Sequence, residues 1–197
     1  MKKSFLVLVM VLLIPFMFFA GTNAEQNSHY SASLSAINQL SVKMSTDPSE
    51  ETLREAKEEI DKLIAKFPNN ARLNALQGYV TLRLIEFSPQ SQQMKMASDT
   101  QQQIEKALSL DSDEYFAHLA NGWLTLSHPS GDVQKSIESF KKAIKLRPHS
   151  AEPYFGIIEA MTMAGMTKEA HEYMETAKEI APDAAEHFDS LLKTDKE

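Results

Sequence analysis

The C-terminal part of the sequence repeats itself at an interval of 34 residues. Each of three residues recurs in kind at that interval: Ala143, Leu146 and Pro148 are followed by Ala177, Ile180 and Pro182. A unit of this length is too short to bury a core alone, so several units must stack against one another. This recurrence constrains the fold more than any other feature, because it predicts a row of similar units.

The units are predicted to be helical. Glycine (6) and proline (8) are sparse in 197 residues, while Leu, Ala, Glu, Lys and Gln, which favour helices, recur throughout. No stretch alternates polar and apolar residues as a half-buried strand does. The hydrophobic content of 43% is enough to build a core. The sequence therefore predicts an all-α protein.

The pattern within the last unit resembles the tetratricopeptide repeat family. The places that this family fills with bulky, small, aromatic and proline residues are held by Tyr154, Ile157, Ala170, Met174, Ala177 and Pro182, with Gly165 in the turn. Ile158 departs from the pattern, since a small residue is expected there, and it predicts a slightly spread helix pair. The resemblance implies a solenoid of helical hairpins.

Four repeats are expected over residues 37–184, at about 37–70, 71–114, 115–150 and 151–184, followed by a C-terminal capping helix and tail at 185–197. The resemblance places Gly78 and Gly122 where two helices cross closely, and Phe140 between repeats. The first repeat matches poorly in its first helix, and the second carries about ten extra residues around FSPQSQQMKM.

The first 24 residues have the pattern of a secretory signal peptide. Lys2 and Lys3 precede an apolar run that ends at Ala20, and Ala24 then closes a short polar stretch. We expect cleavage before Glu25, with Ala20 as the other candidate. An uncleaved anchor helix is the alternative, disfavoured by the short run and by Pro15 within it. Residues 25–36 are expected to form a flexible leader.

Charge and cysteine content narrow the choice of partners. Removing residues 1–24 takes two lysines and no acidic residue from the 20 basic and 27 acidic side chains, which leaves a formal charge of −9. Such a charge argues against a nucleic-acid partner. The chain has no cysteine, so lipid attachment at cysteine, thiol chemistry and cysteine–metal sites are excluded. We expect a periplasmic or secreted protein with no membrane span after cleavage.

No motif for catalysis or for a cofactor is present. The sequence lacks GxSxG, HExxH and a glycine-rich phosphate loop, so an enzyme is not expected. The six histidines are dispersed. Four methionines could hold a soft metal: Met161, Met163, Met166 and Met174. Methionine is also a common filler of helical cores, and neither a metal nor a cofactor is predicted.

Two charge runs stand out. The acidic run comprises Glu50, Glu51, Glu55, Glu58, Glu59 and Asp61, and the basic run comprises Lys141, Lys142, Lys145 and Arg147. Each is interpreted as a solvated helix face, although the runs could orient a partner.

The resemblance also implies a binding surface, because this family lines its concave face with the first helix of each repeat. The corresponding positions are Arg72, Ala75, Tyr79, Leu82 and Arg83; Phe116, Leu119, Trp123, Leu126 and Ser127; and Glu152, Phe155, Glu159, Thr162 and Met163. From these we predict a partner-binding site made of Arg72, Tyr79, Arg83, Phe116, Trp123, Phe155 and Glu159. The segment QGYVTL parallels NGWLTL, so Tyr79 and Trp123 hold equivalent places. The alternative is that both are core residues.

Two classes of function stay open. The favoured hypothesis is an exported scaffold that binds a protein or peptide, for example in the assembly of an envelope complex, with possible association with a membrane complex. The alternative is a transport accessory protein that binds a small molecule or a substrate-binding protein, which a deep apolar pocket would favour. Fold resemblance alone does not decide between them.

Overall fold

The computed structural model describes residues 35, 37–39, 41–44, 48–128 and 131–182. The chain divides into two units, Met1–Asp47 and Pro48–Glu197. In the first unit the described residues, 35, 37–39 and 41–44, are helical. The predicted signal peptide, nearly all of the leader and the predicted C-terminal capping helix lie outside the described residues.

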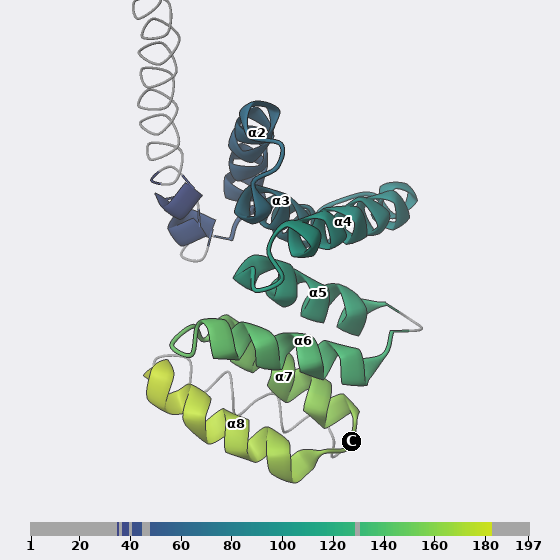
Figure 1. The fold of residues 1–197 in the computed structure, drawn as a ribbon. Coiled ribbons are helices and arrows are strands. Elements are labelled where there is room, and N and C mark those ends of the chain that lie inside the picture. Colours follow the sequence, from purple (N-terminus) through teal and green to yellow (C-terminus); the bar gives the residue numbers. More distant parts are fainter. Residues whose placement is uncertain (1–34, 36, 40, 45–47, 129–130, 183–197) are drawn as a thin grey trace, which may run out of the picture. The chain divides into compact units, whose positions relative to one another are not determined.

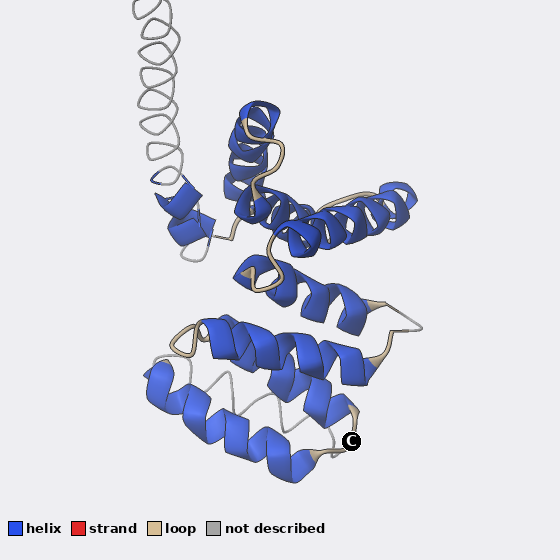
Figure 2. Cartoon of the chain, in the orientation of Figure 1, coloured by secondary structure: helices blue, strands red, loops and turns tan. Residues whose placement is uncertain are grey.

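The second unit is built from helices that pack in pairs (Figure 1). The helices are α2 (Glu50–Lys66), α3 (Ala71–Leu84), α4 (Gln90–Leu110), α5 (Tyr115–Ser127), α6 (Val133–Leu146), α7 (Glu152–Met163) and α8 (Thr167–Ile180). Helix α3 packs against α4, α5 against α6, and α7 against α8, while contacts of α3 with α5 and of α6 with α7 join the pairs. Figure 2 shows helices and loops, and no strand, over the described ranges. The predicted all-α helical-repeat fold is confirmed.

Three of the second helices, α2, α6 and α8, end in the same way. Helices α2, α6 and α8 each stop two residues before a proline, at Pro68, Pro148 and Pro182. The residue between helix and proline has φ near −130° in each case: −129° at Phe67, −139° at Arg147 and −135° at Ala181. Proline disfavours the helical conformation in the residue before it, so its recurrence sets the recurrent helix end.

Close crossings between helices depend on glycine. A Cβ added at Gly122 on α5 would lie 2.6 Å from the Phe140 ring, and one added at Gly156 on α7 would lie 2.2 Å from it. Phe140 itself is fully buried. The two glycines therefore make room for one ring that joins three helices. Ile158, where a small residue was expected, is also fully buried.

The crossings are tied by hydrogen bonds from the second helix to the first. Ser136 Oγ donates to the Gly122 carbonyl at 2.9 Å, and Thr100 Oγ1 donates to the Gly78 carbonyl at 3.5 Å. Both donors belong to buried residues, so these bonds satisfy hydroxyls that would otherwise destabilise the core.

Replacing Gly122 by leucine should lower the free energy of unfolding by about 2–3 kcal/mol, because the Phe140 ring has no space to give way. Denaturant unfolding of the two proteins measures this difference. Glu138→Leu on the exposed face of α6 is the control for adding a leucine, and it should change stability little. Equal stability of Gly122→Leu and the parent would contradict the predicted register of the repeats.

Among the helices described, none is long and apolar enough to cross a membrane.

Candidate protein-binding face

The first helices of three successive pairs, α3, α5 and α7, lie side by side, since α5 contacts both α3 and α7. We call the surface that they form the first-helix face; the sequence-predicted site residues Arg72, Tyr79, Arg83, Phe116, Trp123, Phe155 and Glu159 are on these helices. The structure therefore places the predicted residues on neighbouring helices. Whether they contact a partner stays a prediction.

Equivalent residues on the three helices differ in exposure. Tyr79 is 3% exposed, Trp123 is half-buried, and Glu159, at the same place in α7, is exposed. Two of the other predicted residues, Phe116 and Phe155, are buried and half-buried respectively. Among these residues, the more exposed ones on the first-helix face are therefore on α5 and α7.

Tyr79 is held in a polar cluster rather than left open. Its hydroxyl donates to Glu152 Oε1 at 2.6 Å, and Arg83 Nη1 donates to the Tyr79 oxygen at 2.9 Å. Arg83 Nη1 also lies 3.6 Å from Glu152 Oε1. The Phe116 ring lies against Tyr79 with 5.7 Å between centroids. Tyr79, Arg83 and Phe116 are brought together, and Glu152 joins them from the start of α7.

Burial raises the pKa values of the acidic and phenolic side chains in and beside this cluster. It raises the pKa of the Glu152 carboxyl, against the opposing effects of the Tyr79 hydrogen bond and the Arg83 charge. Burial also raises the pKa of Tyr79, and the neighbouring Glu152 charge adds to this effect. The pKa of Tyr115 is raised to about 12, mainly by burial. Both tyrosines therefore keep their hydroxyl proton at neutral pH.

The raised pKa of Glu152 predicts a pH dependence of stability. The folded chain retains a proton here at pH values above the ordinary 4.5, so the contribution of Glu152 is greatest below 4.5 and is lost as pH rises through the folded pKa. Relative to Glu152→Gln, which does not titrate, the parent should gain stability as pH falls from 7 toward 4. Paired urea titrations at several pH values measure this, and a difference that is constant with pH would contradict it.

A second cluster surrounds Arg147, just past the end of α6. The guanidinium carbon lies 4.2 Å from the Tyr115 ring centroid and 4.8 Å from that of Phe116. Nearby, Arg72 Nε lies 3.7 Å from Glu114 Oε2. Burial, and next the Arg72 charge, lower the pKa of Arg147. The sequence-based interpretation of Arg147 as part of a solvated lysine run is wrong, because its side chain stacks on two rings.

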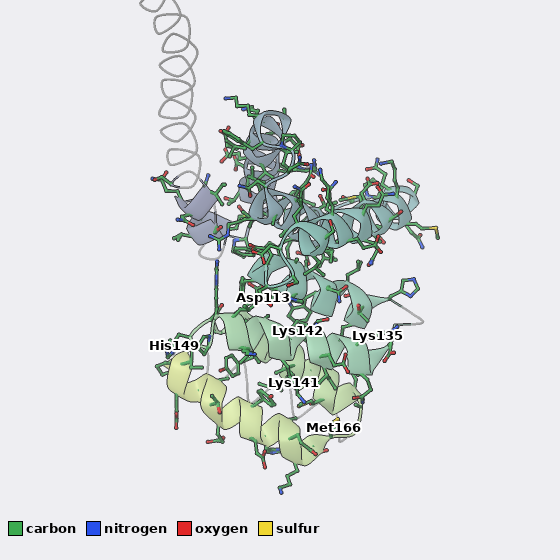
Figure 3. All side chains as sticks on the ribbon, in the orientation of Figure 1. Asp113, Lys135, Lys141, Lys142, His149 and Met166 are labelled. Atoms are coloured by element: carbon green, nitrogen blue, oxygen red, sulfur yellow. The ribbon has the colours of Figure 1, made fainter. Side chains whose placement is uncertain are left out.

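The rest of that run does lie on the surface. Lys141, Lys142 and Lys145 are exposed on α6, and Figure 3 shows Lys135, Lys141 and Lys142 along this helix. Sequence reasoning missed Glu114, Tyr115 and Arg147 as neighbours of the predicted site. The only sequence signal for Arg147 was its place immediately before Pro148, where the helix has to end.

Trp123 has a different environment from Tyr79. Its ring packs edge-on against Phe140, with centroids 5.1 Å apart and planes at 75°. One part of the indole thus rests on the core, while the residue as a whole is only half-buried. This arrangement is that of a rigid aromatic side chain with an accessible edge.

The described residues give no support to the metal-binding alternative. Within the ranges that the structure covers, no group of three or more His, Cys, Asp or Glu side chains could hold a metal ion. Of the four methionines, Met161 and Met174 are buried in the core, whereas Met163 is 61% exposed.

Comparisons with known proteins support the repeat fold. Residues 130–193 match the tetratricopeptide repeat family model. The chain is similar in structure to a thermophilic TPR protein from Thermus thermophilus, with 18% identity and a TM-score of 0.59 over 85% of this chain and 94% of that one. It is also similar to two crystal structures of MamA. One is 20% identical, with a TM-score of 0.48 over 77% of this chain and 84% of that one; the other is 21% identical, with 0.49 over 77% and 90%. No curated protein sequence matches the chain.

Proposed function

We propose that this chain, whose residues 130–193 match the tetratricopeptide repeat family, is a scaffold that binds a segment of another protein on its first-helix face. The observation that carries the proposal is the side-by-side arrangement of α3, α5 and α7 with the half-buried Trp123 and Phe155 beside the exposed Glu159. Aromatic side chains on a rigid support are the residues that anchor protein interfaces. Stacked helix pairs supply such a support over an extended surface.

Export is the second part of the proposal. It is supported by the signal-peptide pattern of residues 1–24, and it makes an envelope complex the class of partner that we favour. The absence of catalytic motifs supports a binding role without an enzymatic one.

The mature protein is expected to begin at Glu25 and to carry no lipid, because Ala24 ends the signal-peptide pattern and cysteine is absent. The intact mass and N-terminal sequence of protein from fractionated cells measure both points. Full-length chain retained in the membrane fraction would contradict the expectation and favour an anchor.

The binding face is tested by site-specific cross-linking in cells. A photo-reactive residue placed at Glu159, which is exposed on α7, should form an adduct with a partner protein; the matched control is the same residue at Lys142, which is exposed on α6. An adduct from position 142 with none from position 159 would move the site to the second helices. The captured partner then serves for affinity measurements.

A further inference from the structure

The Tyr79 cluster joins helix pairs that are not neighbours in the stack. In a repeat protein each pair ordinarily contacts only the next, so stability is a sum of nearest-neighbour terms. Here the hydrogen bond between Tyr79 and Glu152 links α3 to α7 across 73 residues of sequence. Helix α5 lies between the two pairs and contacts both of these helices. The hydrogen bond therefore connects the pairs on either side of the α5–α6 pair directly.

The link is made of three groups that depend on one another. Arg83 donates to Tyr79, which donates to Glu152, while the guanidinium and the carboxylate stay 3.6 Å apart. Glu152 lies in the first turn of α7, where the helix dipole favours a negative charge. Tyr79 is almost completely buried, so breaking its bond to Glu152 would leave the hydroxyl proton without its acceptor in the core.

We propose that Tyr79, Arg83 and Glu152 form a latch that fixes the α3–α4 pair to the α7–α8 pair and so sets the width of the first-helix face. Opening of the latch frees the two outer pairs to move apart about α5. The latch requires no partner and holds whether or not this face is the binding site.

The first test uses Tyr79→Phe, with Tyr154→Phe as a matched control. Tyr154 is also buried, but its hydroxyl donates to the Pro148 carbonyl at 3.0 Å, six residues earlier in the chain. In Tyr79→Phe, amide hydrogen exchange should accelerate in α3 and α7 together by about tenfold, as expected for the loss of a buried hydrogen bond. In Tyr154→Phe, exchange in α3 should stay unchanged.

The second test measures spacing directly. Because the chain has no cysteine, spin labels can be placed uniquely at Gln102→Cys on α4 and Glu179→Cys on α8, both exposed. The distance distribution between the labels should broaden in Tyr79→Phe and in Glu152→Ala, and stay narrow in Tyr154→Phe. Glu152→Ala keeps the test decisive if Tyr79→Phe does not fold. Unchanged distributions in the folded latch variants, or equal broadening in the control, would overturn the proposal.

Discussion

Replacing Phe140 by alanine is expected to lower the free energy of unfolding by about 3–5 kcal/mol, the range for removing a fully buried phenylalanine. The ring is 0% exposed and lies where Gly122 of α5 and Gly156 of α7 approach α6. It also supports the Trp123 ring. Its loss opens a cavity at the junction of two helix pairs, which cannot collapse without moving a helix. Urea unfolding of both proteins measures the effect.

Lys142→Ala is the control, since it truncates an exposed side chain on the same helix. Its stability should stay within about 0.5 kcal/mol of the parent. A loss of less than about 1 kcal/mol in Phe140→Ala would show that the site collapses. The packing of α6 between α5 and α7 would then be looser than the structure indicates.

The sequence predicts the stacking of helix pairs because the residues that determine it act locally. Pro148 and Pro182 end helices through their own geometry, and a glycine such as Gly122 marks a close crossing because no other residue fits there. Pro148 and Pro182 stand 34 residues apart, as do Gly122 and Gly156, so the all-α repeat fold can be predicted from one chain.

The details of the site depend on neighbours distant in the sequence. Tyr79, Trp123 and Glu159 hold equivalent places in their repeats, so the repeat pattern predicts the same environment for all three. In the structure they range from buried to exposed. The exposure of each residue depends on which side chains of other helices pack against it. Glu152 reaches Tyr79 from the start of α7, while Trp123 rests on Phe140 of α6. A periodic pattern contains no information about such pairings.

Trp123→Ala is expected to weaken binding of the captured partner by about 1–4 kcal/mol, the range for an aromatic anchor. Trp123 is the largest half-buried side chain of the predicted site, and its edge-on contact with Phe140 fixes its orientation before binding. Little side-chain entropy is therefore lost when a partner covers it. The dissociation constants of parent and variant, measured with the same partner, give the difference.

The double variant Lys141→Ala, Lys142→Ala separates the first-helix face from the rest of the surface. Both lysines are exposed on α6, so their loss should change affinity little if the partner lies on α3, α5 and α7. Because Trp123 also contacts the core, the comparison requires equal helical content and equal hydrogen exchange in α6, where damage to the Phe140 site would appear first. If folded Trp123→Ala binds as tightly as the parent while the lysine variant loses binding, the site is on the second helices. Trp123 would then be a core residue that packs against Phe140.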